Sequence, residues 1–386
     1  MKVMYVTPGL GRGGGAERSL SSLVPHWRHV LDLEVVTFSD RAELLRDVID
    51  AGATVTNLNG RSLQEVIPQL RRLVKTRRPD LVHSVLFDAD VAARLATPFG
   101  IPVSCSLVTV NYGPQQWAAP GRSRWKVTAA QAVDAMSAQR VARFHALSSE
   151  VASVMKERLR ISRDRIEIIP RGRDREELGW PSQLRREQTR DKLGIREDQP
   201  LLMATARHEW QKGLDLLLGA FPAIREAVPD VTLRIGGRDG TETQRLRGLA
   251  EAAGLDPDSV FIGPREDVPD LMCAADVYCV PSRWEGLGSI MIEAMALGAT
   301  VVAADIGPIR ELDTSGSWID FFTPNDSTAL ASVIIRRLRT GPEEDRHRAA
   351  IALYEKAYRS DQIASAMAAF FHNAVHAPLP ARRRIT

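Results

Sequence analysis

Two glutamates on either side of a glycine-rich loop are the residues whose types and spacing point most clearly to chemistry. Glu285 opens the loop, and Glu293 follows it among apolar residues, where an idle carboxylate would be costly to bury. Gly286 and Gly288 let the backbone between them come close to a ligand. The pattern predicts a polar ligand held by backbone groups, with a carboxylate at each side.

The neighbouring elements indicate how this loop would be positioned. The apolar run Val277–Val280 predicts a buried strand, Pro281 ends it, and Ser289 is the expected N-cap of a helix. A strand, a glycine loop and a helix N-terminus hold phosphate well, because free backbone N–H groups and the helix dipole converge there. The spacing of these residues alone favours a phosphate-binding loop only slightly over a tight turn that binds no ligand.

The segments that carry these residues match one known family. The stretch 285–298 resembles the E-x7-E signature of family 4 retaining glycosyltransferases, which have the GT-B fold. Arg207 and Lys212 match the R-x4-K-G motif of that family, and Gly14–Arg18 resembles its first-domain loop. The resemblance spans nearly the whole chain and is strongest over Arg207–Glu311.

The resemblance implies a role for each matched residue. Arg207 and Lys212 hold the diphosphate, because a planar guanidinium and a point charge together stabilise the negative charge on the leaving group. Glu285 orients hydroxyls of the donor sugar, and Glu293 accepts hydrogen bonds from the ribose. The other expected binding residues are Gly286, Leu287, Gly288, Ser289 and Ile290 around the β-phosphate, Gly263 and Arg265 at the nucleobase, and Gly14, Gly15 and Glu17 on the sugar and acceptor side.

The sequence departs from the family pattern at two places. Asn111 stands where many members carry a histidine close to the donor sugar, and an amide neither takes nor gives a proton at neutral pH. As a catalytic candidate, Asn111 is therefore limited to hydrogen bonding a hydroxyl, and activity depends on the leaving phosphate accepting the acceptor's proton. Ile168–Asp174 resembles the family's I-P-N-G-V-D, with Arg171 and Arg173 adding two positive charges.

Alternating strand-like and helical stretches predict parallel, doubly wound sheets. We expect an α/β protein of the GT-B type, with two Rossmann-like domains facing across a cleft. Residues 1–178 form the acceptor-side domain, to which a C-terminal helix over 359–386 crosses back, and residues 179–358 form the nucleotide-sugar-binding domain. Gly179–Gln199 is expected to be the linker, within a hinge region that begins at Gly172, and Val260–Ile262 to be a strand.

Composition bounds the class of protein. A chain of 386 residues, 44% hydrophobic and 26% charged, is long enough for two or three domains. Cys105, Cys273 and Cys279 have neither metal-ligand nor disulfide spacing, so we expect buried thiols in a reducing compartment. No apolar stretch is long enough to span a membrane, and the N-terminus runs straight into a strand-like pattern. We expect a bacterial, cytoplasmic protein, with peripheral contact at the inner face of the cell membrane left open.

Three further patterns have plainer explanations. Asp88-Ala89-Asp90 has the form of a metal-binding D-x-D, but acids at a helix start usually serve as caps, so we expect no metal. His83, alone at a strand end, is expected to be satisfied structure or cleft lining. Gln115–Arg143 combines cations with two tryptophans, which fits an anionic membrane or a lipid-linked acceptor as well as an ordinary surface helix. No recognised nucleic-acid module is present, so nucleic acid is not an expected partner.

The sequence therefore predicts a retaining, metal-independent hexosyltransferase without a cofactor. The donor is a nucleotide-diphosphate sugar, with UDP chosen from family frequency, and the acceptor is a saccharide, a lipid-linked or a small molecule, as in polysaccharide biosynthesis. Three alternatives stay open: a GT-B protein that binds nucleotide sugars without turnover, a GT-B epimerase or phosphorylase, and an NAD-dependent oxidoreductase. The last is compatible with a glycine loop over Gly9–Gly15 followed by Asp40 after the next strand.

Overall fold

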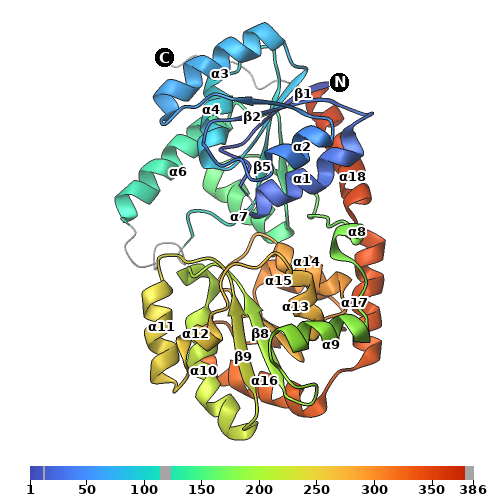
Figure 1. Ribbon diagram of the computed structural model, residues 1–386. Helices are drawn as coiled ribbons and strands as arrows, with labels where there is room; N and C mark the ends of the chain where they lie inside the picture. Colours follow the sequence, from blue (N-terminus) through green and yellow to red (C-terminus); the bar gives the residue numbers. More distant parts are fainter. Residues whose placement is uncertain (12–13, 114–122, 379–386) are drawn as a thin grey trace. The chain divides into compact units, whose positions relative to one another are not determined.

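The computed structural model describes residues 1–11, 14–113 and 123–378, which form two compact α/β units (Figure 1). The described residues up to Asp174 and those from Tyr358 onward make the first unit, and Arg175–Ala357 make the second. Each unit is built on one parallel sheet, so the predicted fold class of two doubly wound parallel-sheet domains is confirmed.

The boundary between the units falls just before Arg175, slightly ahead of the expected boundary after residue 178. The Arg175 guanidinium donates to the Glu355 carboxylate at 2.8 and 3.0 Å and lies 4.2 and 4.4 Å from the ring centroids of Trp180 and Tyr354. These charged and aromatic contacts fix the short helix α8 (Arg175–Leu178) to the second unit.

The first unit contains a seven-stranded parallel sheet in the order β3-β2-β1-β4-β5-β6-β7. β1 is central because it pairs with both β2 and β4, so that Val3 lies opposite Leu33 on one side and Leu81 on the other. Strands covered on both faces are nearly all apolar, and β1 is buried from Val3 to Val6. The strands are β1 (Lys2–Val6), β2 (Asp32–Thr37), β3 (Thr54–Asn57), β4 (Leu81–Val85), β5 (Val103–Leu107), β6 (Arg143–Ala146) and β7 (Ile166–Ile168).

Helices cover both faces of this sheet, and alternate residues of β1 show which helix lies on which face. Val3 and Tyr5 point into a core formed with α1, α2 and α18, whereas Met4 and Val6 pack against α3 and α4. A further core lies between β5, β6 and the helices α6 and α7. The helices are α1 (Gly15–Trp27), α2 (Leu45–Asp50), α3 (Leu63–Arg77), α4 (Phe87–Ala96), α6 (Arg124–Ala138), α7 (Ser149–Leu159) and α18 (Ser360–Val375).

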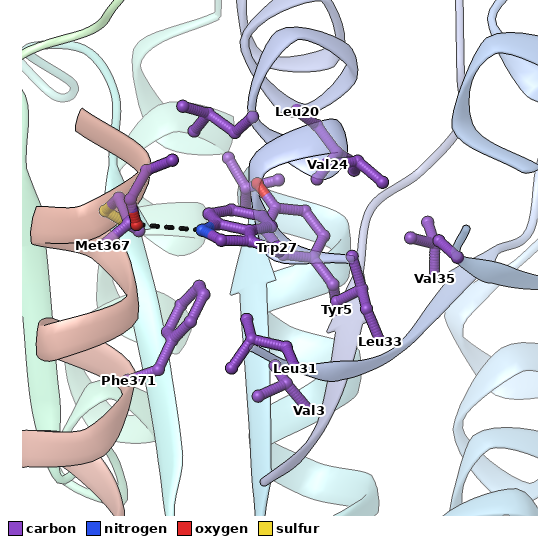
Figure 2. Close-up of a cluster of buried hydrophobic side chains, with 14 of the residues drawn as sticks. Val3, Tyr5, Leu20, Val24, Trp27, Leu31, Leu33, Val35, Met367 and Phe371 are labelled. Atoms are coloured by element: carbon purple, nitrogen blue, oxygen red, sulfur yellow. Dashed lines mark hydrogen bonds between the residues drawn. The ribbon is translucent and has the colours of Figure 1, made fainter. Parts of the chain in front are cut away.

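The last described helix, α18, packs on the first unit, where Trp27 holds it. Figure 2 shows the Trp27 ring near Tyr5 of β1 and next to Met367 and Phe371 of α18. The indole N–H donates to the backbone carbonyl of Ala364 at 2.9 Å, and the ring meets that of Phe371 edge-on at 5.5 Å. Because the indole is both buried and hydrogen-bonded, it joins the end of the chain to its first helix.

The second unit contains a five-stranded parallel sheet in the order β12-β11-β10-β8-β9. Leu202 and Ala204 of β8 join α10, α11 and α16 in one core, and α13 and α14 lie on the other face with α9 and α17 packed against them (Figure 1). The strands are β8 (Leu201–Thr205), β9 (Thr232–Gly236), β10 (Val277–Val280), β11 (Val301–Ala304) and β12 (Ile319–Phe322). The helices are α9 (Gln183–Lys192), α10 (Leu214–Ala227), α11 (Thr243–Ala252), α12 (Pro257–Val260), α13 (Val268–Ala274), α14 (Ser289–Ala296), α15 (Gly307–Arg310), α16 (Ser327–Thr340) and α17 (Glu344–Ala357).

The prediction of a linker over Gly179–Gln199 is wrong, because this stretch contains α9, which packs on α13. Ser182 caps the helix, and the buried Arg190 guanidinium donates to the Ala274 carbonyl at 2.8 Å and to the Asp276 carboxylate at 3.4 Å. Charged side chains hold α9 in place, and it has no apolar stripe that a sequence pattern would reveal.

The prediction of a strand over Val260–Ile262 is also wrong. Val260 ends α12, and only one isolated bridge, between Ile235 and Phe261, remains of the expected pairing. The β12 strand was not predicted, because its short apolar run stands among turn residues and has no clear alternation.

The strand order reverses beside the first strand of each sheet. β8 lies between β9 and β10, and β1 lies between β2 and β4, so successive loops diverge at the carboxyl edge. In open parallel sheets such a reversal leaves a crevice outside the carboxyl ends of the strands, where ligands bind. Each unit therefore offers one such position, after β1 and β4 in the first and after β8 and β10 in the second.

Two buried histidines belong to a continuous chain of hydrogen bonds in the first unit. His83 lies 2.8 Å from the Ser104 hydroxyl and 2.9 Å from that of Ser106, which lies 2.8 Å from Nδ1 of His145. Nε2 of His145 must donate to the Ile169 carbonyl, 2.8 Å away, so its Nδ1 accepts. Burial lowers the pKa of both histidines, that of His145 to about 4. His83 is therefore a structural residue, buried and hydrogen-bonded through both ring nitrogens.

The free energy of unfolding should decrease as the pH is lowered, because these two imidazoles are neutral in the folded chain. Unfolded His145 binds a proton with a pKa near 6.5, whereas the folded residue stays neutral down to about pH 4, so unfolding takes up a proton between these values. Lowering the pH across this window should reduce the free energy of unfolding by on the order of 3 kcal/mol because of this residue. His145→Gln should flatten the pH dependence of the urea-unfolding free energy accordingly.

The control for this prediction is His29→Gln, which changes an exposed histidine of the same unit. The control should keep the slope of the unchanged protein between pH 4 and 6.5. A slope in His145→Gln that equals the control's would contradict a neutral buried His145.

Candidate active site

The candidate residues of the second unit lie together at the carboxyl edge of its sheet. Arg207 and Lys212 follow β8, and Glu285 lies in the loop between β10 and α14. β8 and β10 are paired, so these loops flank the position where the strand order reverses. The topology thus brings residues 73 positions apart in the sequence into contact.

Lys212 and Glu285 touch each other directly. The Lys212 ammonium donates to Oε1 of Glu285 at 2.6 Å, and the Ser282 hydroxyl donates to the same oxygen at 2.7 Å. The lysine side chain is 19% exposed and the glutamate side chain 9%, so water reaches the cation more readily than the carboxylate. An ammonium has three donors, and an arriving anion can therefore compete for it.

A second ion pair fixes the same two loops to each other. Arg283 donates to both oxygens of Asp215 at 2.8 Å, and its guanidinium lies 3.6 Å from the centroid of the Trp210 ring. The guanidinium also donates to the Trp210 carbonyl at 2.8 Å, and the Arg283 backbone N–H donates to the Gln211 carbonyl at 2.8 Å. These bonds hold the backbone next to both partners of the lysine–glutamate pair.

Arg283, Asp215 and Trp210 were missed in the sequence. An acid in the first turn of a helix is ordinarily explained by the helix dipole, and spacing does not reveal which distant arginine reaches it. The usable signal was the position of Arg283 beside a predicted site glutamate.

Gly213 allows the two loops to approach this closely. Its φ of 64° lies in the left-handed region, and a Cβ atom on it would lie 2.0 Å from the Pro281 carbonyl oxygen. Both the backbone angle and the neighbouring backbone exclude a side chain at this position.

The predicted N-cap of α14 is wrong by one residue. Gly288 is the N-cap, with a φ of 75°, and Ser289 is the first helical residue. Glycine takes this left-handed angle without strain, which serine does not. Gly286 and Leu287 are buried before it, and Ile290 follows in the first turn. The first turn of α14, where the helix dipole places partial positive charge, begins directly after the loop that holds Glu285.

Glu293 lies one turn further along α14 and is only 5% exposed. Burial raises the pKa of Tyr278, and the nearby charge of Glu293 raises it further. The Tyr278 hydroxyl shares a hydrogen bond with Thr205 at the end of β8. The second glutamate is thus a buried carboxylate near the same strand ends.

Arg207 and the residues expected at a nucleobase lie at the ends of β8 and β9. Arg207 is exposed just beyond β8. The Gly237 N–H donates to the Gly263 carbonyl at 2.8 Å, and Arg265, which donates to Asp267 at 2.8 Å, passes close to Gly236. The structure therefore brings every second-unit candidate to one edge of one sheet.

The first-unit candidates around α1 lie at the end of β1. Gly14 is the N-cap of α1, which begins at Gly15. The Glu17 carboxylate folds back over Gly14 so closely that a Cβ atom on that glycine would lie 1.8 Å from Oε2. Residues 12–13 of the same loop lie outside the described residues.

The two arginines that depart from the family pattern have different surroundings. Arg171 lines a small cavity of about 30 Å³ together with Tyr5 and His145, which is room for one water molecule. Arg173 is buried, and its backbone N–H donates to the Tyr358 carbonyl at 3.0 Å where the chain returns to the first unit.

Asn111 follows β5 and adjoins a buried anchor. Its neighbour Tyr112, at a φ of 63°, donates its hydroxyl to Asp134 at 2.8 Å, and the fully buried Arg94 side chain pairs with the same carboxylate. These bonds hold the start of the loop to α4 and α6. The loop's continuation over 114–122, with part of the basic stretch singled out in the sequence, lies outside the described residues.

Among the described residues, no three His, Cys, Asp or Glu side chains are grouped to hold a metal ion. Asp88 and Asp90 of the D-x-D lie in the first turn of α4, where Asp90 accepts from Ser84 at 2.7 Å and lies 3.7 Å from Arg94. The three cysteines are free thiols; Cys105 and Cys279 are buried and Cys273 is partly exposed.

Arg283→Gln should destabilise the second unit by about 3 kcal/mol, because the largely buried Asp215 loses two charged hydrogen bonds and keeps only the longer contact, of 3.4 Å, with Arg245. The control is Arg310→Gln, which breaks an ion pair whose arginine is 64% exposed and should cost less than about 1 kcal/mol. Urea unfolding of both variants measures the difference. Equal losses would mean that the Arg283 pair does not hold the two loops.

Gly213→Ala should lower the melting temperature strongly, because the new methyl group collides with the Pro281 carbonyl. Gly248→Ala is the matched control, since this exposed glycine inside α11 has nothing within 4 Å of an added Cβ. The control should gain about 0.5–1 kcal/mol. Similar melting temperatures for the two variants would refute the close approach of the loops.

Two family models divide the chain in the same way as the two units. Residues 13–177 match the model described as Glycosyltransferase Family 4, and residues 185–356 match the one described as Glycosyl transferases group 1. Together the two models take in most of the chain.

Curated relatives are similar over part of their length. Phosphatidyl-myo-inositol mannosyltransferase from Mycobacterium leprae is 35% identical over 160 residues, which are 41% of this chain and 42% of that protein. D-inositol 3-phosphate glycosyltransferase from Xylanimonas cellulosilytica is 33% identical over 215 residues, 53% of this chain and 50% of that protein. The matched regions thus span about half the length of these relatives.

Solved structures show the same fold at low identity. Anabaena HepE in complex with UDP-glucose has a TM-score of 0.80 at 23% identity and covers 97% of this chain and 100% of that one. A glycosyltransferase from Rickettsia africae has a TM-score of 0.76 at 16% identity and covers 97% and 98%. With both family models matched in order on two parallel-sheet units, the chain belongs to the family 4 glycosyltransferases and has the GT-B fold.

Proposed function

We propose that this protein transfers a hexosyl group from a nucleoside-diphosphate sugar to an acceptor hydroxyl with retention of the anomeric configuration. The observation that carries the proposal is the Lys212–Glu285 contact at the carboxyl edge of the second sheet, next to the start of α14. A cation and a helix N-terminus suit a diphosphate, and a carboxylate suits sugar hydroxyls. Membership of family 4 supports the same reaction.

Binding of the diphosphate exchanges the partner of Lys212 in this proposal. As the bond between the anomeric carbon and the β-phosphate oxygen breaks, Lys212, Arg207 and the first-turn N–H groups of α14 oppose the growing negative charge. Glu285, released from the lysine, accepts hydrogen bonds from sugar hydroxyls, and Glu293 accepts those of the ribose. These cations and N–H groups take the part that a metal plays in other transferases, so we propose a metal-independent reaction without a cofactor.

The acceptor's proton leaves with the diphosphate. The acceptor oxygen bonds to the anomeric carbon on the face from which the diphosphate departs, and its proton passes to the departing phosphate oxygen. A protein base is then unnecessary, which fits the presence of Asn111, whose amide only hydrogen-bonds a hydroxyl. Gly14, Gly15 and Glu17 serve the sugar and acceptor side.

For the donor we propose a UDP-hexose, and for the acceptor a saccharide or the polar head of a lipid. The support for UDP is the complex of Anabaena HepE with UDP-glucose. The support for a lipid head is the name of the relative from Mycobacterium leprae, a phosphatidyl-myo-inositol mannosyltransferase. Peripheral contact with an anionic membrane would then bring the protein to its acceptor. Within the described part of the chain, every helix is too short or too polar to cross a membrane.

A binding protein without turnover is the second candidate, and Asn111 is the residue that favours it. Release of UDP from UDP-glucose, assayed over a panel of saccharide and lipid acceptors, separates the two. Binding of the nucleotide sugar without release of UDP would favour the second candidate.

Lys212→Ala should lower the turnover number on the order of 10²-fold, because the growing charge on the diphosphate loses one fixed donor. Lys192→Ala, at an exposed lysine in the last turn of α9, is the control and should keep normal turnover. The rate of UDP release in steady state is the readout. Turnover close to that of the control would refute the role of Lys212.

A further inference from the structure

One exposed face of α6 is apolar, although a surface helix normally turns polar residues to water. Trp125 is 70% exposed, Val133 41% and Met136 70%. With Ala129 between them, these residues recur at helical spacing and form one stripe about 16 Å long, here called the α6 face.

The α6 face is not the side by which the helix joins its unit. Val127, Ala130 and Ala138 pack into the core shared with α7, β5 and β6. These residues lie about half a turn away from Trp125 and Met136 around the helix axis. The helix is therefore apolar on two opposite sides, and only one side is covered by the first unit.

The α6 face continues into a groove of about 570 Å³ lined by residues of α3, of α6 and of the end of α4 and the turn after it. Leu95 and Phe99 line the groove together with Met136, and they are 48% and 58% exposed. Half of the exposed large hydrophobic residues of the described chain lie in this groove or on the α6 face, a grouping that marks an interaction surface.

Positive charges border this surface. Arg71, Lys75 and Arg140 line the groove, and Arg124 and Lys126 stand on either side of Trp125. Arg140 donates to the backbone carbonyls of residues 97 and 98 and lies 4.2 Å from the centroid of the Phe99 ring.

Acidic side chains are missing from the same segments of the sequence. Residues 66–79 and 91–102 contain no Asp or Glu, and the single acid of 123–140, Asp134, is buried and paired with Arg94. The groove and the α6 face thus carry charge of one sign.

We propose that the α6 face and the adjoining groove dock on an anionic membrane surface. Tryptophan and aliphatic side chains enter the head-group region, and flanking cations attract acidic lipids. A nucleic acid would use the cations but leave Val133 and Met136 unpaired, and a second copy would set cations against cations. The inference rests on the proposed function, because docking would bring the protein to a lipid-linked acceptor. Docking itself can be measured without turnover.

Sedimentation of the full chain with vesicles tests the proposal, with phosphatidylcholine vesicles compared with mixtures that contain phosphatidylglycerol. The protein should bind the anionic vesicles and dissociate as salt is raised. Trp125→Ser/Met136→Ser should weaken binding about tenfold by removing apolar anchors, and Arg71→Glu/Lys75→Glu at least about 20-fold. Brominated lipids should quench the fluorescence of the unchanged protein more than that of Trp125→Phe.

The matched control is Arg46→Glu/Ile49→Ser on α2, which changes an exposed cation and an exposed apolar residue on the other face of the same sheet. This control should bind vesicles normally. All variants should keep normal circular dichroism and, with a water-soluble saccharide acceptor, should release UDP from UDP-glucose at the unchanged rate. If the unchanged protein docks on anionic vesicles but releases no UDP with any acceptor, the proposed function is refuted and the docking proposal stands.

Several results would overturn the docking proposal. Equal binding to neutral and anionic vesicles would remove the role of the cations, and vesicle binding that the α6 variants keep would place docking elsewhere. Tight binding of an RNA oligonucleotide that only the charge variant loses would point to nucleic acid. A dimer in sedimentation velocity that Met136→Ser dissociates would point to a second copy of the chain.

Discussion

The ion pair between Arg283 and Asp215 is the contact on which the candidate donor site depends. It joins the loop after β10 to the first turn of α10, across 68 positions of sequence, and the Trp210 ring covers the guanidinium. A planar fork bonded to both oxygens of a carboxylate fixes orientation as well as distance. Lys212 and Glu285 stand next to this pair in the two loops, so their separation is set before any ligand arrives.

The two ion pairs of the site differ in the number of their hydrogen bonds and in their exposure to water. Arg283 and Asp215 share two bonds, and their side chains are 7% and 13% exposed. Lys212 and Glu285 share one hydrogen bond, and the lysine is the more exposed partner. The first pair is suited to fix the loops, whereas the second can open for a diphosphate and release a carboxylate at the same moment. Gly213 and Gly288 make this arrangement possible, because each takes a left-handed backbone angle.

The sequence predicted the parts of this arrangement that local patterns carry. Strand and helix alternation revealed two parallel-sheet domains, and the motifs around Lys212 and Glu285 indicated residues that the topology brings into contact. Long-range pairings left no such trace, which is why Arg283, Asp215 and Trp210 were missed. The N-cap of α14 was misplaced because a φ angle, and not a hydroxyl, decides it. α9 was read as a linker because salt bridges hold it. The sequence marked residues 115–143 as basic and aromatic, but only the structure tells which apolar side chains of α6 remain exposed.

The central claim is that a diphosphate takes Lys212 from Glu285 while the neighbouring ion pair stays closed. A crystal structure of the protein with UDP bound tests this most directly. The account predicts that Nζ of Lys212 lies within about 3 Å of a β-phosphate oxygen, away from Oε1 of Glu285, with Arg283 still bonded to Asp215. A nucleotide bound elsewhere, with the Lys212–Glu285 contact intact, would contradict the account.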